Sequence, residues 1–171
     1  IIYCKFKFTM KQTSLPFIRT LLAICMVSII VFSCKKDEPF YQVDAFETEL
    51  HRNVNKYRQS QGLSDLVFFH DLFIEARQQS TDWKNSGNPQ QGLDARMDKI
   101  IEHWKPVNLD MLLSTINSKD TAAARIVVEG WIQDSTFRSV ITDDHIQSGP
   151  GIAEGDNGEV FITHFFMKIH D

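Results

Sequence analysis

The sequence predicts an α+β fold in which helices pack on a small antiparallel sheet. Apolar residues recur every three or four positions through much of 44–133, which is typical of amphipathic helices. From residue 147 onward the apolar period changes to two, and Asn157-Gly158 is a typical turn of a β-hairpin. Helices first and a hairpin last is the order expected of an α+β domain.

The first helix is predicted over 44–60. Asp44, with Glu47 three residues later, forms a capping-box pattern at its start, and Gly62 lies just beyond its end. Its apolar stripe consists of Phe46, Leu50, Val54 and Tyr57.

The remaining elements follow from the same patterns and from breaks in them. The chain predicts helices over 71–86, 93–104 and 121–133, a short apolar stretch at 66–69, and strands over 147–153 and 159–168. Pro106 ends the third helix, and Asp120 is a suitable N-cap for the fourth. The stretch 106–119 mixes apolar residues with Asn and Ser, so its pattern favours no single structure.

Residues 1–33 have the layout of a cleavable signal peptide. They contain four basic residues and no Asp or Glu, and the apolar run Leu21–Phe32 is followed by Ser33-Cys34. A membrane-spanning helix needs about 20 apolar residues, so this run is a poor permanent anchor. A signal anchor that stays in the membrane is the alternative.

Val31-Phe32-Ser33-Cys34 resembles the lipobox of bacterial lipoproteins, which implies that Cys34 is acylated, for example by palmitate, and becomes the mature N-terminus. We therefore divide the chain into upstream translated sequence (1–9), signal peptide (10–33), acylated tether (34–43) and one domain (44–171). Lys35-Lys36-Asp37-Glu38 resembles a surface-export signal of some Gram-negative lipoproteins, and a plain solvated tether is the alternative. The expected location is the outer membrane.

Charge and cysteine content limit the partners. Beyond the four leader bases the chain has 14 basic and 22 acidic residues, which does not suit nucleic acid. An acidic domain does not suit an anionic lipid surface either, so we expect contact with the membrane through the lipid anchor. Cys34 is the only cysteine beyond the leader, so the domain has no disulfide and no cysteine metal site.

Three segments together resemble the CAP superfamily (SCP-like domains), which includes cysteine-rich secretory proteins, antigen 5 and pathogenesis-related 1 proteins. They are Leu50–Arg58 with its Asn55-x-x-Arg58 motif, Trp131–Arg138, and Gly149–Ala153. The resemblance implies an α-β-α sandwich. It also implies a central cleft where two His and acidic residues converge and, in several members, hold a divalent metal.

The chain departs from the family at that cleft. Gln90 stands at the first His position, Val107 at a Glu position and Phe137 at the second His, and only Asp134 keeps a carboxylate nearby. Val and Phe neither transfer protons nor bind metal. We therefore expect a degenerate cleft with no metal, no cofactor and no catalytic residue.

The interpretation is a membrane-anchored, non-catalytic CAP-like binding or interaction domain, with an envelope protein as partner. One alternative is a carrier of a lipid or other hydrophobic ligand. Another is a hydrolase with an unorthodox site that includes Asp134, Asp143, Asp144 and His145. His164 alternates with apolar residues in the last strand, which predicts a hydrogen-bonded core position.

Overall fold

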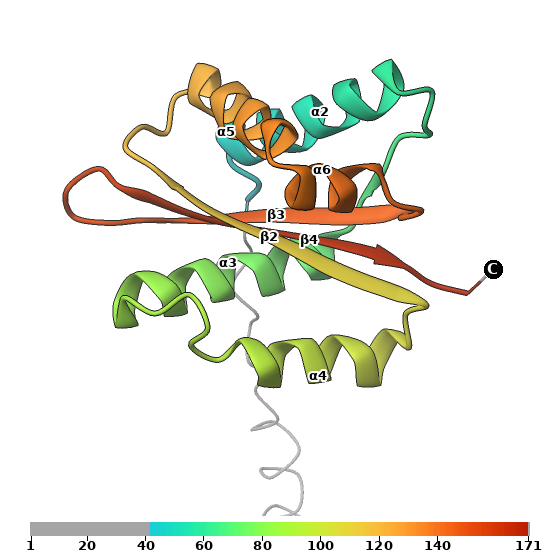
Figure 1. Ribbon diagram of the computed structural model, residues 1–171. Helices are drawn as coiled ribbons and strands as arrows, with labels where there is room; N and C mark the ends of the chain where they lie inside the picture. Colours follow the sequence, from blue (N-terminus) through green and yellow to red (C-terminus); the bar gives the residue numbers. More distant parts are fainter. Residues whose placement is uncertain (1–41, 171) are drawn as a thin grey trace, which may run out of the picture. The chain divides into compact units, whose positions relative to one another are not determined.

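The computed structural model describes residues 42–170 (Figure 1). Cys34, the leader and residues 34–41 of the tether lie outside the described residues. The elements in chain order are α2 (Ala45–Ser60), β1 (Val67–Phe68), α3 (His70–Ser86), α4 (Leu93–Trp104), β2 (Asn108–Ile116), α5 (Thr121–Gln133), α6 (Ser135–Thr142), β3 (Gln147–Glu154) and β4 (Val160–Lys168). None of the helices in this part of the chain is long and apolar enough to cross a bilayer.

The four strands form one mixed sheet in the order β1-β3-β4-β2. The predicted hairpin is confirmed, because β3 pairs antiparallel with β4 and Ile152 lies opposite Ile162. β2 also pairs antiparallel with β4, with Leu112 opposite His164, whereas the short β1 is parallel to β3. The sheet is therefore antiparallel except at one edge.

Helices cover both faces of this sheet (Figure 1). α2, α5 and α6 lie on one face, and α3 and α4 lie on the other. β4 supplies apolar residues to both layers: Ile162 and Phe166 pack against α2 and α5, whereas Phe165 and Met167 pack against α3 and α4. The α-β-α arrangement implied by the sequence is confirmed.

The capping box at the start of α2 forms as predicted. The Asp44 carboxylate accepts a hydrogen bond from Phe46 N at 2.8 Å, and Asp44 N donates to Glu47 Oε2 at 2.8 Å. Two backbone donors that would otherwise lack partners at the helix N-terminus are thus satisfied.

The stretch whose structure the sequence leaves open contains β2. Its side chains alternate between the two layers, with Leu112 in the core beside α5 and with Leu109 and Met111 against the core beside α4. A second difference is α6, which starts as a separate helix because Asp134 caps it and accepts hydrogen bonds from Thr136 N and Phe137 N.

Candidate functional site

The four predicted cleft positions do not meet around one cleft. Gln90 and Val107 lie at opposite ends of α4, in the connections that precede and follow this helix. Asp134 caps α6 and Phe137 lies in this helix, on the other face of the sheet, where Phe137 packs against the core formed with α2 and α5. These residues therefore do not fit the divalent metal that the family resemblance implies.

A half-buried polar group links α2 to the sheet instead. Asn55 Nδ2 donates to the Leu66 carbonyl at 3.0 Å, and Asn55 Oδ1 accepts from Leu66 N at 2.8 Å. Asn55 Nδ2 also lies 3.2 Å from His51 Nε2, and His51 Nδ1 lies 3.0 Å from Ser148 Oγ. Because an amide nitrogen only donates, His51 accepts at Nε2 and donates its Nδ1 proton to Ser148.

His164 lies beside this group, completely buried on β4. Its ring centroid is 6.3 Å from that of His51 and 6.0 Å from that of Trp131. Both His164 ring nitrogens and Trp131 Nε1 have no hydrogen-bond partner among the described residues. The prediction of a core position is confirmed, but the predicted hydrogen bond to His164 is wrong, because its neighbours are aromatic rings.

A second polar group lies where β2 begins and the α6–β3 connection ends. His145 Nε2 is 3.0 Å from Asp110 Oδ2, and Asp143 completes a set whose ligand atoms all lie within 4.8 Å of one another. The His145 side chain is fully buried, whereas Asp110 is 36% exposed at its side chain and Asp143 is exposed. The sequence indicates Asp143, Asp144 and His145, but not Asp110.

Arg58 holds the connection that carries this group. The guanidinium donates to the carbonyls of Ile141, Asp143 and His145 at 2.7, 2.9 and 3.2 Å, and from Nε to Ser64 O at 2.9 Å. The Asn-x-x-Arg motif thus acts through the backbone: Asn55 fixes the chain at Leu66, and Arg58 fixes the α6–β3 connection.

Comparisons with known proteins give the same family. The sequence matches the model of the CAP, or cysteine-rich secretory protein, family over residues 51–167. The chain belongs to this family. A search of curated protein sequences gives no match.

Solved structures with the same fold come from several bacteria. An outer surface protein from Borrelia burgdorferi matches with a TM-score of 0.60 and 14% identity, over 76% of this chain and 98% of that one. A cysteine-rich secretory protein from Staphylococcus aureus matches with a TM-score of 0.59 and 17% identity, over 76% of this chain and 40% of that one. An extracellular SCP-domain protein from Bacillus anthracis matches with a TM-score of 0.55 and 17% identity, over 71% of this chain and 40% of that one. This CAP domain thus spans 40% of the length of the last two.

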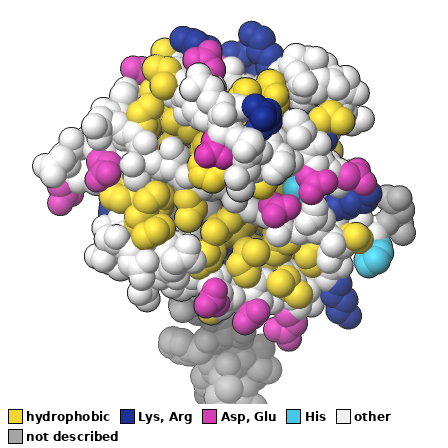
Figure 2. Space-filling model, in the orientation of Figure 1, with side chains coloured by type: hydrophobic (Ala, Val, Ile, Leu, Met, Phe, Trp, Pro, Cys, Tyr) yellow, Lys and Arg dark blue, Asp and Glu magenta, His cyan; other side chains and the backbone are white. Residues whose placement is uncertain are grey.

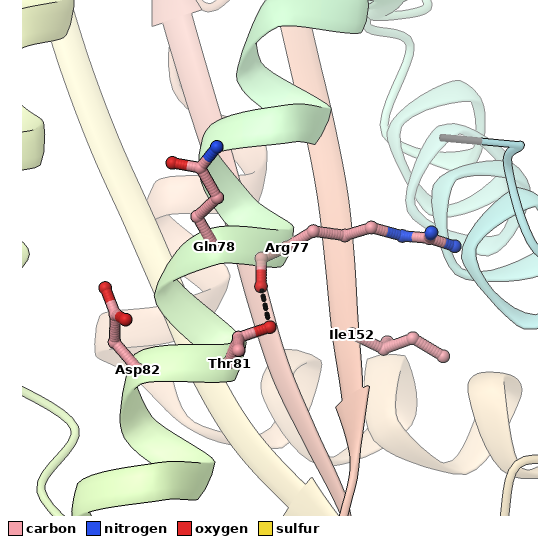
Figure 3. Close-up of a pocket in the computed structure, with 5 residues that line it drawn as sticks. All are labelled: Arg77, Gln78, Thr81, Asp82 and Ile152. Atoms are coloured by element: carbon pink, nitrogen blue, oxygen red, sulfur yellow. Dashed lines mark hydrogen bonds between the residues drawn. The ribbon is translucent and has the colours of Figure 1, made fainter. Parts of the chain in front are cut away.

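One surface hollow of the CAP domain, of about 370 Å³, lies beside α3 and β3. It is lined by Arg77, Gln78, Thr81, Asp82 and Ile152. Figure 3 shows that Arg77 extends toward α2, whereas Gln78 and Asp82 point away on the other side of α3. The polar side chains do not converge, so this hollow lacks the arrangement of a catalytic site.

Arg77 instead forms part of a buried ion pair that closes the edge of the sheet. Its Nε and Nη2 donate to the two oxygens of Glu47 at 2.6 and 2.7 Å, and Glu47 is completely buried. Glu47 Oε1 also accepts from Ile152 N at 3.0 Å, on the part of β3 beyond its pairing with β1. Glu47 therefore ties α2, α3 and the edge of β3 together.

The buried imidazoles predict a pH dependence of stability. Burial lowers the pKa of His164 well below its ordinary value, with the nearby His51 as a second cause, and burial also lowers the pKa of His51. An unfolded His titrates near pH 6.5, so below this pH the unfolded chain binds more protons than the native one. For His164, whose pKa is shifted furthest, we expect the free energy of unfolding to fall between about pH 6.5 and 5 by up to about 1.4 kcal/mol per pH unit, and His51 adds a smaller decrease in the same direction.

Urea unfolding followed at several pH values measures this slope. The variant His164→Leu should show a shallower slope over the same window, because it removes the most strongly shifted imidazole. Unfolded carboxyls titrate near pH 4, below the window. A wild-type stability that stays constant from pH 7 to about 5 would contradict the buried neutral state of these rings.

Proposed function

We propose that this CAP domain is a non-catalytic binding domain of the cell envelope, anchored through Cys34, that pairs an extended segment of another envelope protein with the outer edge of β2. The observation that carries the proposal is that β2 is a long edge strand. It has nine residues, and its outer side has no strand neighbour among the described residues.

The edge lacks most of the features that usually prevent pairing, and Asp110 is the one charged side chain of the strand. Proteins block edge strands with Pro, Lys or a bulge, but Asn108–Ile116 contains no Pro or Lys and pairs with β4 in unbroken register. Figure 2 shows hydrophobic side chains along the path that β2 follows in Figure 1. Val107 is 55% exposed, and Leu109, Met111 and Leu113 are only half buried. Backbone pairing and apolar contact are therefore both available to a partner strand.

Charge indicates the kind of segment that fits. Asp110 lies on β2 itself, and the exposed Asp143 and Asp144 lie beside its first residues, where Asn108 Nδ2 donates to Asp143 Oδ2 at 2.9 Å. A second copy would bring a further acidic surface, since the chain beyond the leader has 14 basic and 22 acidic residues. An extended segment that carries basic residues is the complementary partner.

Three further observations support binding at the envelope in preference to catalysis. Gln90, Val107 and Phe137 offer no acid-base group at the family's cleft positions. The structural relatives include an outer surface protein and an extracellular protein. Cys34, although outside the described residues, has the lipobox context that would keep the domain at a membrane.

The alternatives have less support. Asp134 precedes α6 and His145 follows it, so the two residues of the suggested hydrolase site lie beyond opposite ends of a helix that is about 12 Å long. Asp144 is paired with Lys168. The hollow beside α6 is lined mainly by polar residues, among them Gln61, Ser135 and Arg138, which does not favour a hydrophobic ligand.

Binding of nine-residue peptides, matched to the length of β2, tests the proposal. One peptide alternates Val with Thr and carries two Lys, a second replaces both Lys by Glu, and a third carries a central Pro. We expect the Lys peptide alone to bind, with slower amide hydrogen exchange along β2, because only it combines strand pairing with opposite charge.

A matched pair of variants locates the binding surface. Thr115→Lys places a like charge on the exposed edge of β2 and should weaken binding of the Lys peptide at least about tenfold. Thr81→Lys, at an exposed position on α3, should leave binding unchanged. Equal binding by all three peptides, protection outside β2, or equal effects of the two variants would overturn the proposal.

A further inference from the structure

The geometry points to a divalent cation site formed by Asp110, Asp143 and His145. It lies at the first residues of β2 and is separate from the family's cleft positions, Gln90 and Phe137. Each residue offers one ligand atom, and these atoms all lie within 4.8 Å of one another. A cation bound at about 2.0–2.2 Å would bring these ligand atoms to about 3.0–3.5 Å from one another, so the side chains would need to move only slightly.

The buried imidazole is the observation that indicates a ligand. The His145 side chain has no exposed surface, yet its Nδ1 has no hydrogen-bond partner among the described residues. Its Nε2 points into the group and contacts one oxygen of Asp110 at 3.0 Å. A bound cation would take the place of the proton between His145 Nε2 and the Asp110 carboxylate.

Neutral imidazole is the form that binds metal ions. Burial lowers the pKa of His145 and so favours this form, whereas the carboxylates of Asp110 and Asp143 act in the opposite direction.

All three ligands are held by a rigid scaffold. Asp110 is fixed in the β2–β4 ladder, opposite Phe166. The connection that carries Asp143 and His145 is held by Arg58, which donates to both of their carbonyls at 2.9 and 3.2 Å. Asp143 also accepts from Asn108 Nδ2, an outer contact of the kind that orients metal-binding carboxylates.

The ligand set and its exposure indicate the class of cation. Two carboxylate oxygens and one imidazole nitrogen suit a first-row divalent ion, and their two negative charges would balance its charge. Asp110 and Asp143 face solvent, which leaves positions for water or for a group of a bound partner. Zn²⁺ is the suitable probe because it binds such sites more tightly than Mn²⁺ does.

Titration of the metal-free full-length chain with Zn²⁺ by calorimetry tests the site. Asp143→Asn removes an exposed ligand and should fold normally. The full-length wild type should bind one equivalent of Zn²⁺ more than this variant, or bind that equivalent at least about tenfold more tightly. His145→Ala should lose the same equivalent. His103→Ala, at an exposed His on α4, should keep it.

A second measurement keeps the test valid if His145→Ala does not fold. With Co²⁺ in place of Zn²⁺, absorption bands of the bound ion should appear in the wild type and in His103→Ala and be lost or altered in Asp143→Asn. Unchanged stoichiometry, affinity and spectra in Asp143→Asn would overturn the inference. The peptide experiment is done without metal, so its outcome is independent of this one.

Discussion

The variant Gly151→Ala should lose about 3 kcal/mol or more of its free energy of unfolding, or fail to fold. Gly151 lies on β3 directly against the backbone of α3. A Cβ atom there would stand 2.1 Å from Arg77 N and 2.4 Å from the carbonyl carbon of Ala76. Because both neighbours are helix backbone, relief requires α3 to move away from the sheet and from its packing in the core. Urea unfolding followed by circular dichroism measures the effect.

Gly130→Ala is the matched control. Gly130 lies in α5, and a Cβ atom there would meet nothing within 4 Å. Ala is favoured over Gly inside a helix, so this variant should gain about 0.5–1 kcal/mol. Similar losses in the two variants would show that the close contact between β3 and α3 does not exist in solution.

The sequence predicts best where a local pattern and the tertiary structure require the same residue. Asp44 and Glu47 predict the start of α2, and both form the capping box there. The Asn157-Gly158 turn predicts the β3–β4 hairpin in the same way, and Gly158 adopts the left-handed conformation, with φ 79°. No local pattern, however, reveals that Glu47 also binds Arg77 and Ile152 N across the edge of the sheet.

The β2 strand is the part of the fold that the sequence predicts least. Its alternation is obscured because Leu112 lies in one core while Leu109 and Met111 contact the other, so both faces of the strand are apolar. As an edge strand it also carries polar residues, such as Ser114, that a central strand would exclude. A mixed stretch of this kind is typical of several structures, so periodicity alone does not identify it.

The candidate site shows the same limit. Asp143 and His145 attract attention in the sequence because acid and His stand together, but Asp110 lies 35 positions away from His145. Only the register of β2 on β4, which places Asp110 opposite Phe166, brings its carboxylate to the imidazole. The predicted set of Gln90, Val107, Asp134 and Phe137 rests instead on the family resemblance, and in the structure these residues lie on both faces of the sheet.

Replacement of Arg58 by Ala should reduce the free energy of unfolding by about 3–5 kcal/mol. The side chain is buried, with 3% of the residue exposed, and donates four hydrogen bonds to backbone carbonyls. A hydrogen bond from a charged donor contributes about 1.5–3 kcal/mol, although the four are not additive. Without Arg58, buried carbonyls such as that of Ile141 lose their partner and are far from water.

Two comparisons separate this role from a general effect of charge. Arg58→Lys keeps the charge but should recover less than half of the loss, because one ammonium cannot reach four carbonyls from one position. Arg52→Ala, at an arginine in the same helix whose side chain is 64% exposed and paired with Glu49, should change stability by less than about 1 kcal/mol. Urea unfolding followed by Trp fluorescence measures all three variants.

Hydrogen exchange locates the loss. The amides of His145 and Ile146, which donate to the Asp143 and Met167 carbonyls, should exchange faster in Arg58→Ala because the α6–β3 connection is no longer held. The exchange rates of the amides of α3, on the other face of the sheet, should rise only as much as the lower global stability requires. If Arg58→Ala were no less stable than Arg52→Ala, the four carbonyl contacts would not hold this connection, and the scaffold of the Asp110–Asp143–His145 group would need a different explanation.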